Sequence, residues 1–272
     1  MTDWLPVCRE AARAVGRVLE ELPTRVEREP RVGDGEGGDE TTAVDAAAEA
    51  AVVACLEVAA AAGTGFTLVS EELGERVFGD GGDGLRIVCD PIDGSMNAKR
   101  GIPFFSLSLA VASGPRMEDV ELGFVHDYGS GEEWVARRGE GAVLDGRPLD
   151  GPGPKKRIEI LSFEATRTDL VAERVAEMVG LAYRTRIMGS LALSLCHLAA
   201  GRVDAVVSLK AARSVDIAAA QLLVRERGLA IDLPEDPPFG EAPLDLAARS
   251  RVVAAATPAL CDELYARLTA SS

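Results

Sequence analysis

The sequence has little histidine, few aromatic residues and no paired cysteine motif. Only two histidines, His126 and His197, occur in 272 residues. The sequence therefore offers few residues for a histidine-rich metal site or a serine–histidine–aspartate triad. The five cysteines are scattered and odd in number, which argues against a zinc site or a disulfide framework. We therefore expect a reducing, cytoplasmic environment.

Long apolar runs and an excess of basic residues are also missing. No stretch approaches the ~20 apolar residues that span a bilayer, and the N-terminus lacks the features of a signal peptide. The 44 acidic residues outnumber the 29 basic ones, which gives a net charge of −15. Nucleic acids and anionic membranes bind basic surfaces, so we expect neither as a partner. A small phosphorylated substrate would instead need bound cations to neutralise the site.

What remains is the composition of a globular protein, with 47% hydrophobic and 27% charged residues. A polar, glycine-rich segment at 27–40 predicts a mobile loop. A Gly- and Pro-rich segment at 150–156 predicts a boundary between an N-terminal subdomain, 1–152, and a C-terminal subdomain, 153–272. Periodicity predicts helices at 4–22, 46–62, 170–178, 190–200 and 216–224, and strands at 66–70, 85–89, 104–112, 121–128, 133–137, 158–162, 182–187, 203–208 and 251–256.

The most informative stretch reads DPIDGSMN and begins at Asp90. Asp90 closes an apolar strand, and Asp93 follows in a turn that Pro91 stiffens and Gly94 allows to bend sharply. Ser95 is suited to begin a helix whose free N–H groups face this turn. Two acids beside such amides indicate a site for a metal-bound phosphate.

Three more acids stand at the ends of expected elements. Asp45 begins an alanine-rich helix, Glu71 follows a short strand, and Asp216 precedes an apolar helix. Taken singly, Asp45 and Asp216 have the ordinary interpretation of helix N-caps, and Glu71 that of a solvated loop acid. Together with Asp90 and Asp93, in a chain nearly free of histidine, they favour an oxygen-ligated hard metal, for which Mg²⁺ is the natural choice.

In order along the chain, these motifs resemble the inositol monophosphatase superfamily, a group of Mg²⁺-dependent sugar phosphatases. The resemblance is carried by SEE at 70–72, DPIDGS at 90–95 with Asn97, and DIAAA at 216–220. GIPFFSLS at 101–108 and GSLAL at 189–193, with Cys196, resemble the archaeal branch, whose single site serves inositol monophosphate and fructose 1,6-bisphosphate. The resemblance implies a mixed α/β fold with layers in the order α-β-α-β-α, a site between two subdomains, and a homodimer.

The resemblance also implies roles for individual residues. Those with metal roles are Glu71, Asp90, the Ile92 carbonyl, Asp93 and Asp216, which together would hold two or three Mg²⁺ ions. Ser95 and Asp45 would orient and deprotonate the attacking water, and Asp39 in the preceding loop would assist a metal.

The substrate contacts follow from the same resemblance. Gly94 and Ser95 would hold the phosphate through their amides, and Gly189 and Ser190 would also contact the substrate. Three cations, Arg186, Lys210 and Arg213, are candidates for a second phosphate and equally for solvated surface positions. The segment around Lys210 is shorter than its archaeal counterparts, which leaves the choice of substrate open.

Three other interpretations remain open. One is a 3′-phosphoadenosine phosphatase of the same superfamily, although an aromatic content of 4% offers few partners for stacking a base. Another is a non-catalytic metal- or phosphate-binding relative, against which the combination of the acids with Ser95 argues. A purely structural protein would leave Asp90, Asp93 and Asp216 as unrelated caps and would show no dependence on Mg²⁺.

Overall fold

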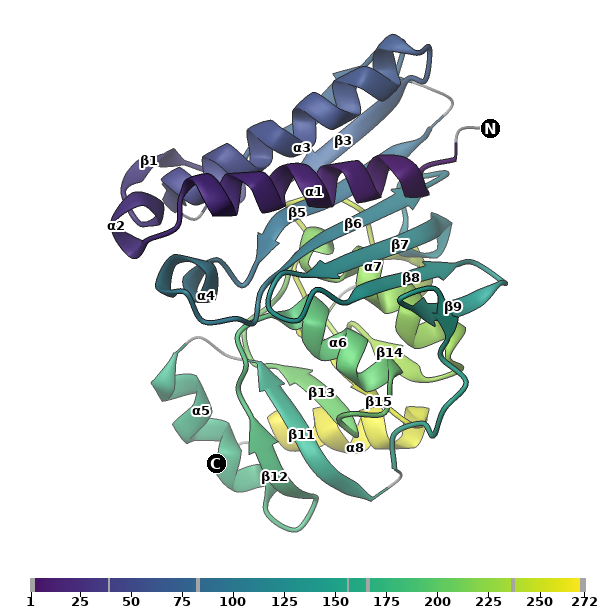
Figure 1. Ribbon diagram of the computed structural model, residues 1–272. Helices are drawn as coiled ribbons and strands as arrows, with labels where there is room; N and C mark the ends of the chain where they lie inside the picture. Colours follow the sequence, from purple (N-terminus) through teal and green to yellow (C-terminus); the bar gives the residue numbers. More distant parts are fainter. Residues whose placement is uncertain are drawn as a thin grey trace.

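Two β-sheets alternate with three layers of helices in the computed structural model (Figure 1). The structure describes residues 3–38, 40–81, 84–155, 157–164, 167–235 and 238–269. From the N-terminal side the order is helix, sheet, helix, sheet, helix, which confirms the mixed α/β architecture. In the described part of the chain, no helix is both long and apolar enough to cross a membrane.

The first sheet has eight strands, and β3 and β5 are its parallel pair. Helices α1 (Leu5–Glu21) and α3 (Ala43–Ala61) cover its outer face. Trp4 meets Phe66 edge-on, and Phe66 stacks on Phe78, so aromatic packing joins the helical layer to the sheet. In spatial order the strands are β10 (Arg147–Pro148), β9 (Gly141–Leu144), β8 (Glu133–Arg137), β7 (Val120–Asp127), β6 (Ser106–Ala112), β5 (Arg86–Asp93), β3 (Phe66–Ser70) and β4 (Gly74–Phe78).

The middle layer consists of α6 (Leu191–Ala199) and α7 (Ser214–Glu226). Both helices are buried on nearly all sides, as expected for helices enclosed between two sheets. Helix α7 lies very close to β7 at Gly123. A Cβ atom added at this glycine would come within 2.3 Å of the Ala219 carbonyl oxygen. Glycine at this position therefore allows α7 to approach the sheet, and with it the first turn that carries Asp216.

The second sheet has five strands and packs against α6 and α7 on one face. Its other face forms a separate apolar cluster with α8 (Pro258–Thr269), α5 (Thr168–Val175) and the 3₁₀ turn η2 (Ala176–Met178). In spatial order the strands are β12 (Ala182–Arg186), β11 (Ile158–Glu164), β13 (Ala205–Ser208), β15 (Val253–Ala255) and β14 (Ala230–Asp232). The remaining elements are α4 (Ser95–Arg100) and the 3₁₀ turns η1 (Met117–Asp119) and η3 (Phe239–Glu241).

The structure corrects two expectations about local structure. The segment expected to be a loop contains α2 (Arg25–Arg28) and a hairpin of β1 (Arg31–Asp34) and β2 (Glu40–Thr42). Asp45 and Asp216 are not N-caps: each lies at the third helical position, and its carboxylate accepts a bond from the cap residue's backbone N–H. The last strand of the first sheet ends at Pro148, and the first strand of the second sheet begins at Ile158. The subdomain boundary at 152/153 stays a prediction.

Candidate active site

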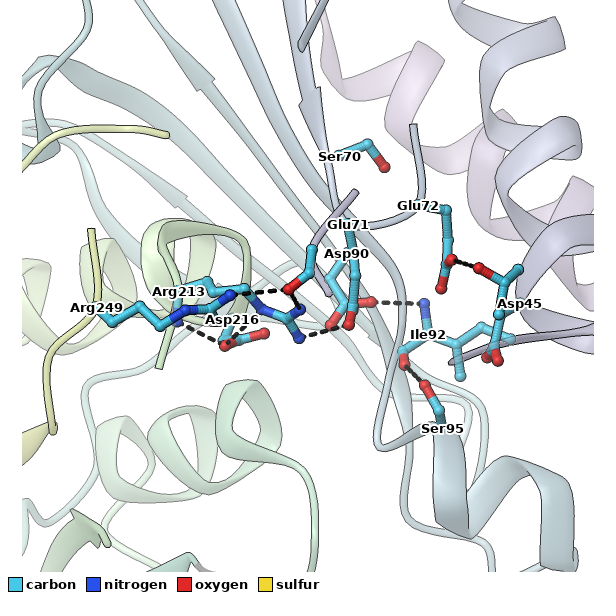
Figure 2. A network of polar contacts seen from close by, with 12 residues as sticks. Asp45, Ser70, Glu71, Glu72, Asp90, Ile92, Ser95, Arg213, Asp216 and Arg249 are labelled. Atoms are coloured by element: carbon cyan, nitrogen blue, oxygen red, sulfur yellow. Dashed lines mark hydrogen bonds and ion pairs between the residues drawn. The ribbon is translucent and has the colours of Figure 1, made fainter. Parts of the chain in front are cut away.

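The register of two parallel strands brings the first two acids together. Strands β3 and β5 pair with Ser70 opposite Cys89, so Glu71 and Asp90, the next residues on each, leave the same edge of the sheet side by side. The side chain of Asp216 reaches this edge from the first turn of α7, which packs on β5 and β6. Three elements far apart in sequence therefore converge at one point (Figure 2).

The backbone at the end of β5 is irregular, which turns successive side chains toward the same region. Asp90 pairs with Ser108 and Asp93 with Ser106 on β6, so one extra residue is accommodated between them. The Asp90 Oδ1 atom accepts a 2.9 Å bond from the Ile92 N–H, which fixes the turn. Gly94 ends it at φ +93°, where a Cβ atom would lie 3.1 Å from the Gly189 carbonyl oxygen. Both the left-handed conformation and the close approach require glycine there.

Glu71, Asp90 and Asp216 form a compact cluster of carboxylates. One oxygen from each lies within 4.8 Å of the others, and their side chains face one another in Figure 2. Burial raises the pKa of Glu71 to about 8, with Asp216 and Glu72 adding to the rise and Arg213 opposing it. Burial also raises the pKa of Asp90 well above its ordinary value, again with help from neighbouring carboxylates. Burial, and to a lesser extent the neighbouring carboxylates, disfavour the ionised acids, and a bound cation would stabilise them, so this donor set fits a hard divalent metal.

Asp93 lies in the same turn as Asp90, but its hydrogen-bond partners come from the start of α6. Its Oδ2 atom accepts a hydrogen bond from the Ser190 hydroxyl and a 2.8 Å bond from the Ala192 N–H at the start of α6. Burial raises the pKa of Asp93 to about 7, while the Ser190 hydrogen bond lowers it. Among the described residues Asp93 is outside the group of three clustered acids, although it was predicted to share a metal with Asp90 and Asp216.

Asp45 has one carboxylate oxygen that accepts hydrogen bonds and one that is buried without a partner in the described part of the chain. Its Oδ2 atom accepts bonds from the Thr42 N–H at 3.1 Å and the Thr42 hydroxyl at 2.5 Å, and pairs with Lys99 Nζ at 3.2 Å. Its Oδ1 atom is buried without a hydrogen-bond partner in the described part of the chain. It lines a small pocket together with Ser95, whose hydroxyl donates to the Ile92 carbonyl at 3.0 Å instead of to Asp45. The predicted pair thus shares a pocket without touching.

A cavity of about 500 Å³ opens beside these acids. It is lined by Gly94, Ser95 and Gly189, as predicted for a substrate site, and by basic side chains from several elements. These basic residues are Lys99, Lys210, Arg213 and Arg249. A larger groove between α1 and α3, of about 800 Å³, has a mainly apolar lining and contains none of the clustered acids.

The three cations named for a second phosphate, or equally for surface positions, are divided in the structure. Arg186 is exposed at the end of β12, donates to the Thr185 carbonyl, and is not among the residues that line the cavity. Arg213 lines the cavity but places its guanidinium between Glu71 and Asp216 (Figure 2). Asp39 lies outside the described residues.

Sequence reasoning missed Lys99, Arg249 and Glu164. Glu164 ends β11 as Glu71 follows β3, so the same signal of an acid at a strand end could have identified it. Lys99 lies one turn after Ser95 on α4, but nothing local indicates that it pairs with Asp45. Arg249 donates to the Gly37 carbonyl at 2.8 Å across more than two hundred residues, and no local pattern predicts that contact.

Glu164 binds the backbone turn at 188–190, and Ser190 in that turn donates a hydrogen bond to Asp93. Its buried carboxylate accepts hydrogen bonds from the Gly189 N–H at 2.9 Å and from the hydroxyls of Ser162 and Ser194. The Asn97 amide grips the same turn by donating to the Met188 carbonyl at 2.7 Å. The position of the Ser190 hydroxyl on Asp93 is therefore set by polar contacts on both sides of the turn.

Comparison with known proteins agrees with this geometry. Residues 1–272 match the inositol monophosphatase family. The chain is 33% identical over 234 residues to a fructose-1,6-bisphosphatase/inositol-1-monophosphatase from Methanothermobacter thermautotrophicus, covering 83% of this chain and 82% of the relative. It is 32% identical over 241 residues to the Nus factor SuhB of Pasteurella multocida, covering 84% of each.

The solved structures lead to the same conclusion. The crystal structure of an inositol monophosphatase–fructose 1,6-bisphosphatase superimposes with a TM-score of 0.82 at 25% identity, covering 98% of this chain and 100% of that one. The matches span both sheets and the helices around them, including every element that contributes to the acid cluster. The chain belongs to the inositol monophosphatase family.

Proposed function

We propose that this protein is a Mg²⁺-dependent phosphomonoesterase that hydrolyses inositol monophosphate, fructose 1,6-bisphosphate or both. The observation that carries the proposal is the cluster of Glu71, Asp90 and Asp216, with oxygens within 4.8 Å of one another at the wall of a cavity. The archaeal relative bears the names of both activities. The basic side chains along the cavity suit an anionic substrate.

Glu71, Asp90 and Asp216 are the residues that would hold Mg²⁺, and Asp93 and the Ile92 carbonyl lie next to them. When bound, Mg²⁺ would lower the pKa of the attacking water and offset the charge of the phosphate. The protein's own part is to keep these carboxylates close together and partly buried, so that they favour a small, hard cation over water. Glu164 and Asn97 contribute by fixing the turn that holds Asp93.

Asp45 and Ser95 are suited to handle the proton of the attacking water. Because Asp45 Oδ2 is bound by Thr42 and Lys99, the side chain cannot rotate freely, and the buried Oδ1 atom of this pocket-lining residue remains as a possible acceptor. Ser95 borders the same pocket and can exchange its bond to Ile92 for one to water. Attack by this water would release phosphate directly, with no phosphorylated enzyme.

The substrate would lie in the cavity with its phosphate against Gly94 and Ser95. Lys99 and Lys210 line the same cavity and would attract a phosphorylated sugar to a chain that is acidic overall. Ser208 also lines it, and a hydroxyl there can bond a sugar hydroxyl without adding charge. These features favour a small polyol phosphate over a nucleotide, which would need aromatic partners for its base.

The test is phosphate release from inositol 1-phosphate and fructose 1,6-bisphosphate, measured side by side with and without Mg²⁺. We expect Mg²⁺-dependent turnover of at least one substrate. Asp90→Asn should abolish it, because the variant loses a carboxylate shared by the cluster. Glu75→Gln, which changes an exposed carboxyl on β4 outside the site, should retain it.

The outcomes separate the competing interpretations. Turnover of only one substrate would show that the site around Lys210 is selective. No turnover of either substrate despite bound Mg²⁺ would refute the proposal and favour a non-catalytic role, since one relative of this chain is named as a Nus factor. Release of phosphate from 3′-phosphoadenosine 5′-phosphate alone would assign the nucleotide activity instead.

A further inference from the structure

Arg213 contacts two of the three acids in the cluster, Glu71 and Asp216. Its Nη2 atom lies 2.5 Å from Glu71 Oε1, and its Nε atom lies 3.6 Å from Asp216 Oδ2. The side chain is only 8% exposed, so these contacts are made away from water. The guanidinium therefore shares one positive charge between two of the three carboxylates in the cluster.

A metal ion bound to the Glu71 oxygen that Arg213 contacts would lie close to the guanidinium, and the two cations would repel each other. Mg²⁺ binds carboxylate oxygens at about 2.0–2.1 Å. An ion on Glu71 Oε1 would thus lie less than about 5 Å from the Arg213 nitrogen that contacts the same oxygen. In partly buried surroundings the repulsion at that separation is several times the thermal energy.

We propose that Arg213 is a built-in counter-cation that competes with the metal for Glu71 and Asp216 and so sets the affinity of the site. The inference rests on the proposed function, because it takes these acids as metal ligands. Arg213 stabilises the acid cluster when no metal is present, and metal binding displaces its guanidinium. The residue thereby limits metal binding without being a ligand itself.

The local structure permits this exchange. The Arg213 backbone is the N-cap of α7, and its N–H donates to Asp216 Oδ2 at 2.8 Å, so the main chain stays in place. The long side chain borders the 500 Å³ cavity and can turn into it. The Gly37 carbonyl, which Arg213 contacts at 3.4 Å, also accepts a 2.8 Å bond from Arg249, so the loop at 35–38 keeps an anchor when Arg213 leaves.

The experiment is a calorimetric titration of metal-free protein with Mg²⁺, in the absence of substrate. Arg213→Met removes the charge and keeps an apolar stem, and we expect it to bind Mg²⁺ at least about tenfold more tightly than the wild type. Arg249→Met is the matched control. It removes one positive charge from the same cavity and a bond to the same Gly37 carbonyl, but no contact with Glu71, and should change the affinity less than about threefold.

Thermal unfolding supplies a second measurement. Metal-free Arg213→Met should unfold at a lower temperature than the wild type, because its buried carboxylates lose their cation, and saturating Mg²⁺ should remove the difference. Equal or weaker Mg²⁺ affinity in Arg213→Met would overturn the proposal. An equal gain in Arg249→Met would also overturn it, since the effect would then be one of general charge.

The wild type provides a test that does not depend on how the variant folds. With ¹⁵N-labelled arginine, the Arg213 side-chain N–H signal, assigned by its absence in Arg213→Lys, should be protected from exchange in metal-free protein and lose that protection as Mg²⁺ is added. Retained protection at saturating Mg²⁺ would refute the displacement. Phosphate release measured separately distinguishes the two failures: an active enzyme with unchanged protection loses only this inference, whereas an inactive one that binds metal loses the proposed function.

Discussion

Substitution of Glu49 would measure how much the burial of an acidic side chain near the site lowers the free energy of unfolding. It lies one turn after Asp45 on α3 and is 4% exposed. Its Oε2 atom accepts a 2.6 Å bond from the Ser70 hydroxyl, and its Oε1 atom has no hydrogen-bond partner in the described part of the chain. Burial raises the pKa of Glu49 from 4.5 to about 7, with the Ser70 bond opposing the rise.

The sign of the effect follows from this direction. Because the pKa is higher in the folded state, the unfolded chain releases the proton first as the pH rises. The contribution of Glu49 to stability is therefore fully present below about pH 4.5 and is lost as the pH rises through about 7. A shift of this size corresponds to about 3 kcal/mol in the free energy of unfolding.

Glu49→Gln should remove this dependence, since an amide imitates the neutral acid at every pH. We expect the variant to be more stable than the wild type by no more than about 1 kcal/mol at pH 5 and by about 3 kcal/mol at pH 8.5. The assay is urea unfolding of metal-free protein at both pH values. The other buried acids of the site titrate in both proteins, so they cancel in the comparison.

Glu57→Gln is the matched control, because Glu57 is an exposed carboxyl on the same helix. It should alter the free energy of unfolding by less than about 0.5 kcal/mol at either pH. The reasoning is refuted if the difference between Glu49→Gln and the wild type is the same at pH 5 and pH 8.5.

Three further predictions concern other parts of the molecule. Asp93→Asn should lower phosphate release at least about 100-fold in steady-state assays, and near-normal activity would contradict its role at the site. Lys99→Met should lower the free energy of unfolding by about 3 kcal/mol in urea, because the buried Asp45 loses its partner, whereas Lys99→Arg should restore most of the loss. Gly123→Ala should destabilise by about 1–3 kcal/mol or more by thermal unfolding, as its Cβ would strike the Ala219 carbonyl, whereas Gly16→Ala in α1, with open space around it, should be neutral or stabilising.

The acids could be predicted from the sequence because their placement depends on local geometry. Strand ends and helix starts are visible in apolar patterns, and two neighbouring parallel strands must end at one edge of a sheet. Glu71, Asp90 and Asp216 were grouped as acids at the ends of expected elements, and in the structure their carboxylates lie together. Asp93 was expected in the same group but is turned toward Ser190, a residue almost a hundred positions away.

The wrong predictions of local structure have a different cause. The hairpin before Asp45 was not predicted, because Gly33 and its polar neighbours carry no alternating apolar pattern, although their backbones pair and Arg31 and Glu40 form an ion pair across the two strands. Asp45 was interpreted as a cap because an acid at the start of a helix usually is one. In the structure Thr42 takes that place, which moves Asp45 one turn inward, to a buried position. This shift of three residues turns a solvated cap into a functional candidate.

The basic side chains of the site, unlike the acids, could not be placed from local sequence patterns. Lys99 reaches Asp45 from α4, and Arg213 reaches Glu71 from the start of α7, so each pairing depends on the complete fold. A chain with a net charge of −15 thus offsets part of the charge of its own acids with basic side chains, and the proposed Mg²⁺ would offset the remainder. Neither cation is among the acids proposed as metal ligands, so under the proposed function substitution of Lys99 or Arg213 should change the metal affinity while the donor set stays intact.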